Sequence, residues 1–228
     1  GGRGQVQMCV RDRVGRPVHD IEMATTLAPV GTQNALTSAG IKSVPTGLDF
    51  GTVTAVLPNR TVEVTSLRRD VETDGRRAVV AYTTDWREDA LRRDFTINAL
   101  YYCIRDFSVI DFANGVDDLN NRQMRLIGDP ETRYREDPVR MLRAVRFAGK
   151  LDFEIERKTK APIEMMAPLM EQIPAPRLFE EVLKLFLSGN ALVTYRLYVN
   201  ISYLVSCSLS LSNAWLTMNL PPTLLNKP

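Results

Sequence analysis

Hydrophobic and polar residues alternate along two neighbouring stretches in the first half of the chain. Residues 52–57 (TVTAVL) and 62–67 (VEVTSL) follow the two-residue period of strands with one buried face. Asn59 lies between them in a Pro-Asn-Arg sequence, and asparagine favours tight turns. The pattern therefore predicts a β-hairpin here.

Further strand-like stretches surround this hairpin. Residues 78–82 (AVVAY) are rich in β-branched side chains, residues 97–104 are largely apolar, and residues 107–112 form another strand candidate. Between residues 18 and 113 the sequence therefore predicts a mixed sheet with a few helices.

The apolar period changes to that of a helix further along the chain. Apolar side chains recur every three or four positions over residues 139–151, and Asp137 and Pro138 precede them as a cap and a first-turn proline. Residues 177–187 have a similar amphipathic pattern that stops before Gly189. The second zone is therefore predicted to be helical, and the whole chain to be of the α+β class.

The last zone lacks the charged face of an amphipathic helix. Residues 197–220 contain no charged side chain, which raises the alternative of a membrane span. Serine and asparagine are frequent in this stretch and argue against one. We therefore expect residues 191–228 to be an atypical, poorly ordered tail and expect no membrane partner.

The composition of the chain limits which kinds of functional site it can contain. The 228 residues carry a net charge of only +2, so any RNA contact must come from local arginine clusters. One histidine and three cysteines without metal-ligand spacing disfavour histidine triads and zinc sites. With no signal peptide at the start, we expect a cytoplasmic protein, with an organelle as the alternative.

Two acidic residues form the first candidate site. Asp20 and Glu22 are two positions apart, so on a strand both carboxylates would face the same side. Paired carboxylates can hold Mg²⁺ ions against a triphosphate. The alternative is an ordinary solvated strand edge.

Arginines provide the other two candidates. Residues 92–100 (RRDFTINAL) place paired arginines before an apolar run, which suits triphosphate or ribose contacts or, alternatively, a charged helix start. Asp137, Arg140 and Arg143 are spaced to lie along one stripe of a helix. That stripe could form an internal salt-bridged face, or an edge that pairs with a nucleobase.

Together these segments resemble the class II tRNA nucleotidyltransferases and bacterial poly(A) polymerases. The resemblance covers residues 10–189 and includes VRD at 10–12, RRDFTINAL at 92–100 and EDPVR at 136–140, in the family's order. It implies a nucleotidyltransferase head (residues 1–113), a helical neck with a nucleobase-selecting helix (residues 114–190), and a truncated C-terminal body. Residues 115–119 and 125–130 resemble the hinge between head and neck.

The resemblance also implies roles for individual residues. Asp20 and Glu22 would be catalytic and hold a pair of Mg²⁺ ions, while the RNA 3′ hydroxyl attacks the nucleotide's α-phosphate and releases pyrophosphate. The nucleotide, ATP with CTP as a second candidate, would bind a larger set: Arg11, Arg93, Asp94, Asn98, Asp137, Arg140 and Arg143. The RNA would be a tRNA or an mRNA, and the oligomeric state is left open.

Two alternatives remain open within this family. Residues 44–53 and 63–85 resemble CCA-adding enzymes, whereas residues 92–189 resemble poly(A) polymerases. Glu22 stands where the family has aspartate, and Gly1-Gly2 is separated from residues 10–12 by a longer segment than in the family. A catalytically weakened nucleotide- or RNA-binding remnant is therefore the alternative function.

Overall fold

The computed structural model describes residues 5–7, 22–73 and 78–187. The chain divides into two compact units, residues 1–128 and residues 129–228, and each is described by itself. The predicted tail, residues 191–228, lies outside the described residues. Among the helices that the structure describes, none has the length and apolar character needed to cross a membrane.

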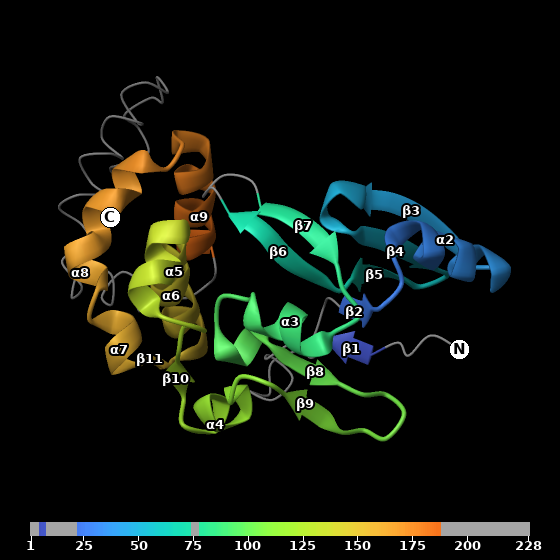
Figure 1. Ribbon diagram of the computed structural model, residues 1–228, viewed down its shortest axis with the longest axis horizontal. Helices are drawn as coiled ribbons and strands as arrows, with labels where there is room; N and C mark the ends of the chain where they lie inside the picture. Colours follow the sequence, from blue (N-terminus) through green and yellow to red (C-terminus); the bar gives the residue numbers. More distant parts are fainter. Residues whose placement is uncertain (1–4, 8–21, 74–77, 188–228) are drawn as a thin grey trace, which may run out of the picture. The chain divides into compact units, whose positions relative to one another are not determined.

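A seven-stranded mixed sheet forms the first unit (Figure 1). Parallel pairing joins β2 to β5, and the other neighbours in the sheet are antiparallel. In spatial order the strands are β3 (Lys42–Gly47), β4 (Thr52–Leu57), β5 (Arg60–Ser66), β2 (Glu22–Thr25), β1 (Gln5–Gln7), β8 (Leu100–Tyr102) and β9 (Val109–Asp111).

Smaller elements complete this unit. A separate hairpin consists of β6 (Arg68–Thr73) and β7 (Ala78–Tyr82). The remaining elements are α2 (Pro29–Ser38), η1 (Leu48–Phe50), α3 (Trp86–Leu91), η2 (Thr96–Asn98), α4 (Gly115–Asn120) and β10 (Gln123–Met124).

The hairpin predicted around Asn59 is confirmed as β4 and β5. Val53 pairs with Val64 and Ala55 with Val62, and all four side chains are buried. The alternation in the sequence thus arises because one face of these strands is buried and the other carries threonine and glutamate. Helix α2 packs against β3, β4 and β5.

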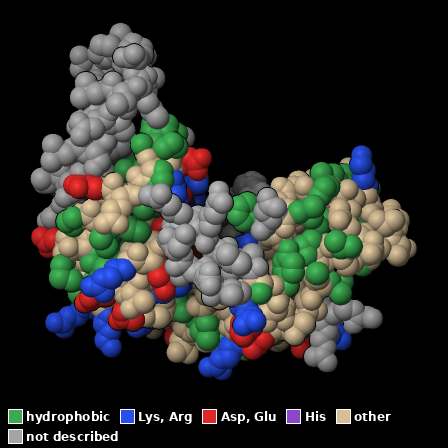
Figure 2. All heavy atoms as spheres, turned by 45° about the horizontal axis from the view of Figure 1, so that its top comes forward, with side chains coloured by type: hydrophobic (Ala, Val, Ile, Leu, Met, Phe, Trp, Pro, Cys, Tyr) green, Lys and Arg blue, Asp and Glu red, His purple; other side chains and the backbone are tan. Residues whose placement is uncertain are grey.

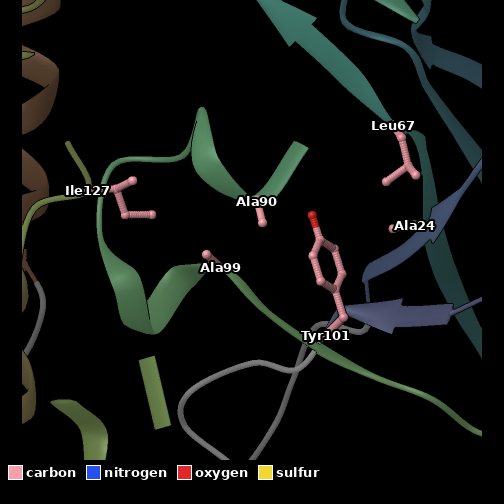
Figure 3. Close-up of a cluster of buried hydrophobic side chains, with 6 residues drawn as sticks. All are labelled: Ala24, Leu67, Ala90, Ala99, Tyr101 and Ile127. Atoms are coloured by element: carbon pink, nitrogen blue, oxygen red, sulfur yellow. The ribbon is translucent and has the colours of Figure 1, made fainter. Parts of the chain in front are cut away.

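A second cluster of buried side chains joins the sheet to α3 and to the segment after it. Figure 3 shows Tyr101 of β8 pointing toward Ala90 of α3, with Ala24 of β2 and Leu67 close to the same ring. Trp86 meets the Tyr101 ring edge-on, with the ring centroids 5.1 Å apart. This cluster fixes α3 and the residues that follow it against the sheet.

The second unit is mainly helical, as the period of its apolar residues predicts. Its principal helix, α6 (Val139–Leu151), buries apolar side chains at the spacing that the sequence predicts, among them Val139, Leu142 and Val145, and packs against α9 (Ala175–Leu187). The other elements are α5 (Pro130–Glu136), β11 (Glu154–Ile155), α7 (Arg157–Lys160), α8 (Ile163–Met166) and η3 (Ala167–Gln172).

The start of α6 differs in detail from the prediction. Pro138 occupies the N-cap position, and Asp137 has an extended backbone between α5 and α6. The Asp137 carboxylate still accepts a hydrogen bond from the Val139 amide at 3.2 Å. Asp137 therefore precedes the helix, and the prediction that it shares a helical stripe with Arg140 and Arg143 is wrong.

Candidate active site

Glu22 is the first residue of β2 and its side chain is exposed. In the parallel pairing of β2 with β5, Glu22 lies opposite Glu63, whose side chain is also exposed. Paired residues on adjacent strands point to the same face, so these two carboxylates are neighbours. The sequence did not single out Glu63, because that pairing connects strands separated by α2 and β4 and leaves no local signal.

The other residues expected near this edge, Asp20 and Arg11, lie outside the described residues. Within the described part of the chain, no group of three or more His, Cys, Asp or Glu side chains could hold a metal ion. Glu22 and Glu63 supply oxygen ligands of the kind that Mg²⁺ prefers. The predicted metal site at Asp20 and Glu22 therefore stays a prediction.

The paired arginines follow helix α3 directly. They converge on Asp89, a residue of that helix whose side chain is 2% exposed. Arg92 Nε donates to Asp89 Oδ1 at 3.0 Å, and Arg92 Nη2 forms an ion pair with the same oxygen at 2.9 Å. Arg93 Nη2 donates to Oδ2 at 2.8 Å. The spacing of these residues, three and four positions apart, is what a helical turn brings together.

Asp89 also connects α3 to the sheet and to the hairpin. Its carboxylate accepts the Tyr101 hydroxyl at 2.6 Å and the Arg68 backbone amide at 3.1 Å. Burial alone would raise the pKa of Asp89, but the charges of Arg93 and Arg92 and the Tyr101 hydrogen bond outweigh it and lower that pKa to about 2. The carboxylate is therefore ionised at neutral pH.

Asp94 and Asn98 organise the next turn of the chain. Asp94 Oδ1 accepts the Phe95 amide at 2.9 Å and the Asn98 side-chain amide at 3.0 Å. The Asn98 backbone carbonyl in turn accepts Arg93 Nη1 at 3.2 Å. These contacts give both residues a part in shaping the 92–100 segment, and their predicted contact with a nucleotide stays a prediction.

The carboxylate strand and the arginine segment approach the same face of the sheet. Glu22 and Ala24 alternate with Met23 along β2, so both face one side. Ala24 belongs to the buried cluster of Ala90 and Tyr101 (Figure 3), and the Tyr101 hydroxyl donates to Asp89. The sequence separates the acidic and arginine motifs by about seventy positions, and the fold joins them through this cluster.

Helix α4 approaches the 92–100 segment so closely that only glycine fits at its start. A Cβ atom on Gly115 would lie 2.3 Å from the Thr96 carbonyl oxygen. Nearby, the buried Asp118 carboxylate accepts the Thr96 hydroxyl at 2.7 Å and Arg125 Nε at 3.0 Å. The region that resembles a hinge thus holds the arginine segment in place.

In the second unit, both principal base-selecting candidates are engaged within the chain. Asp137 Oδ2 lies 2.7 Å from Arg177 Nη2 of α9. Arg140 Nη1 donates to Glu136 Oε2 and to the Arg133 carbonyl, both at 2.9 Å. The salt-bridged alternative is therefore observed, although with partners outside the stripe that the sequence suggested.

Arg143 has a different environment from Arg140. Its guanidinium carbon lies 5.3 Å from the centroid of the Phe147 ring, one helical turn further along α6. Arg143 and Arg140 are three positions apart on α6 and share a stripe of the helix. The predicted base contact of this arginine stays a prediction.

The described residues in Figure 2 carry both basic and acidic side chains at the surface. Among the residues that the structure describes, Lys and Arg alternate there with Asp and Glu. This agrees with the net charge of +2. Recognition of a polyanion would therefore depend on individual arginines at specific positions rather than on an overall positive potential.

Two family models match this chain. The sequence matches the model of the poly A polymerase head domain over residues 6–125, and that of the probable RNA and SrmB-binding site of polymerase A over residues 152–204. Poly(A) polymerase I of Salmonella typhi is 60% identical over 109 residues, which are 48% of this chain and 23% of that protein.

Two CCA-adding enzymes match over a longer stretch. The enzyme of Enterococcus faecalis is 38% identical over 184 residues, 79% of this chain and 44% of that protein. The crystal structure of the Bacillus stearothermophilus CCA-adding enzyme in complex with CTP has a TM-score of 0.78 and 31% identity, covering 89% of this chain and 49% of that one. The chain thus spans less than half the length of these relatives.

Proposed function

Because this chain belongs to the family of the poly A polymerase head domain, which the CCA-adding enzymes share, we propose that it transfers nucleotides to RNA 3′ ends without a template. The observation that carries the proposal is the approach of the carboxylate strand and the arginine segment to one face of the sheet. ATP is the proposed donor, with CTP as a second one in CCA addition.

The residues of the first unit would handle the triphosphate and the reacting ends. Arg93, with Arg11, would bind phosphate oxygens or the sugar, because a guanidinium fork matches their geometry. Asp20 and Glu22, with Glu63 as the third candidate, would hold Mg²⁺, which neutralises charge on the phosphates when bound. The RNA 3′ oxygen would form a bond to the α-phosphorus as the bond to pyrophosphate breaks.

The residues of the second unit would select the base. Asp137 can accept a hydrogen bond from an exocyclic amine of adenine or cytosine, and Arg140 can donate to a ring nitrogen or a carbonyl. A carboxylate has several acceptor positions, so the contact with Arg177 leaves Asp137 able to accept from a base as well. Arg177 and Glu136 would then orient the two side chains.

Incubation of the chain with radiolabelled ATP or CTP, Mg²⁺ and an RNA primer tests the proposal. Extension by many AMP residues would identify a poly(A) polymerase, and addition limited to C, C and A on a tRNA would identify a CCA-adding enzyme. A chain that binds ATP but extends no primer would instead support the second candidate function, a nucleotide-binding remnant.

The remnant hypothesis rests in part on Glu22, and this residue gives a prediction. Glu22→Asp is expected to raise turnover, because the shorter side chain restores the family's carboxylate spacing, and metal geometry is sensitive to shifts of about 1 Å. Turnover should be measured at saturating Mg²⁺. If it is unchanged or lower, the backbone of β2 has already adjusted to glutamate.

Arg140→Ala is expected to weaken ATP binding by about 1–3 kcal/mol, the size of one good bidentate base contact. Binding of inorganic tripolyphosphate should be unchanged, because the phosphate contacts survive. Arg135→Ala is the matched control, since Arg135 is 61% exposed and paired with Glu131. Equal weakening of ATP and tripolyphosphate would make Arg140 a phosphate ligand or a structural residue.

A further inference from the structure

Asp89 is a buried carboxylate that no sequence motif singled out, and it holds the two arginines of the 92–100 segment. We propose that Asp89 is a positioning residue for nucleotide binding, which orients Arg92 and Arg93 toward the triphosphate. The inference rests on the proposed function, because it requires that a nucleotide binds at this segment.

Three arginines gather around Asp89. Arg92 and Arg93 pair with its carboxylate, and the side chain of Arg68 lies near enough to sense the charges of Arg92, Arg93, Asp89 and Asp70. Guanidinium groups match the geometry of phosphate oxygens, which suits this cluster to a triphosphate. The side chains of Arg92 and Arg93 are 18% and 17% exposed, which leaves both partly accessible.

The contacts fix the direction of each arginine. Arg93 is held at both ends of its fork, by Asp89 at Nη2 and by the Asn98 carbonyl at Nη1, and its guanidinium lies 5.3 Å from the Tyr101 ring centroid. A free arginine side chain loses rotamer entropy when a ligand orders it. Ordering before binding removes much of that cost.

Tyr101 keeps the carboxylate itself in place. Its hydroxyl donates to Asp89 at 2.6 Å, and burial raises the pKa of Tyr101, so the hydroxyl stays protonated as a donor. Tyr101 also packs against Ala24 of β2, the strand that carries Glu22. The contacts of Asp89 and Tyr101 therefore link the positions of the two arginines to that strand. Asp89 thus connects the two arginines to the sheet.

The chain offers a control in Glu181 of α9. This carboxylate is also buried, at 6% exposure, and is paired with two basic side chains, those of Arg146 and Lys184. It belongs to the second unit and not to the 92–100 segment or the helix before it. A purely structural role for Asp89 would make Asp89→Asn behave like Glu181→Gln.

The test compares dissociation constants for ATP and for adenosine by titration, with thermal melting to check folding. Asp89→Asn should weaken ATP by about tenfold or more, the size expected for hydrogen bonds to charged groups, and leave adenosine unchanged. Glu181→Gln should lower the melting temperature without changing the ratio of the two constants. An unchanged ratio in folded Asp89→Asn would overturn the inference.

A second variant makes the test independent of whether Asp89→Asn folds. Arg93→Lys keeps the positive charge but loses the planar fork that Asp89 and Asn98 hold. It should weaken ATP selectively, and Asp89→Asn added to it should then have a reduced further effect. An ATP to adenosine ratio that Arg93→Lys leaves unchanged overturns the inference, whereas a wild-type chain that binds no nucleotide overturns the proposed function and the inference with it.

Discussion

Replacement of Asp20 by alanine is expected to abolish nucleotide addition while the chain stays folded. A metal-bound carboxylate contributes several kcal/mol to the stabilisation of charge on the reacting phosphates. Each 1.36 kcal/mol changes the rate tenfold, so the rate of primer extension should fall by about 1,000-fold or more. The measurement is single-turnover extension of an RNA primer with radiolabelled ATP.

The control for this variant is Asp106→Ala, the same substitution at an exposed residue of the loop between β8 and β9. It should extend the primer at the wild-type rate. Extension by Asp20→Ala at the wild-type rate would show that the metal is held elsewhere, and Glu22 with Glu63 would then be the next carboxylates to replace.

A methyl group at Gly115 is expected to destabilise the first unit by about 3 kcal/mol, at the upper end of the usual cost of overpacking. The Cβ would meet the backbone of Thr96, which cannot rotate away as a flexible side chain could. Because Thr96 belongs to the arginine segment, the affinity for ATP should fall as well. Chemical denaturation and ATP titration of Gly115→Ala measure the two effects.

Gly31→Ala provides the comparison. Gly31 lies inside α2, and a Cβ there would meet its nearest neighbour, the Leu27 side chain, at an ordinary 3.6 Å. Alanine is also the better helix former, by about 1 kcal/mol. This variant should therefore be neutral or slightly more stable, and a similar loss in both variants would mean that the approach of α4 to Thr96 is not rigid.

The sequence predicts where individual helices and strands lie along the chain, but it does not predict which elements far apart in the chain are neighbours in space. The β4–β5 hairpin and helix α6 follow from local periods, because burial of one face imposes a repeat of two or of 3.6 residues. The parallel pairing of β2 with β5 has no such local signal. The position of Glu63 beside Glu22 therefore follows only from the strand register in the structure.

The candidate site shows the same division. The arginines of residues 92–100 were visible as a motif, whereas Asp89 resembles any acid in the first turn of a short helix. Its importance arises from tertiary contacts with Tyr101 and the Arg68 amide. Asp137 was assigned to a helix because its spacing fits one, but Pro138 and the end of α5 place it in the connection before α6.

The position of β1 in the sheet has a consequence for how the chain folds during synthesis. This three-residue strand lies between β2 and β8, and Val6 pairs with Met23 on one side and Tyr102 on the other. During synthesis, strand β2 is made soon after β1, whereas strand β8 is made about eighty residues after β2. One edge of β1 therefore stays unpaired until about eighty further residues have been made, and unpaired strand edges promote aggregation.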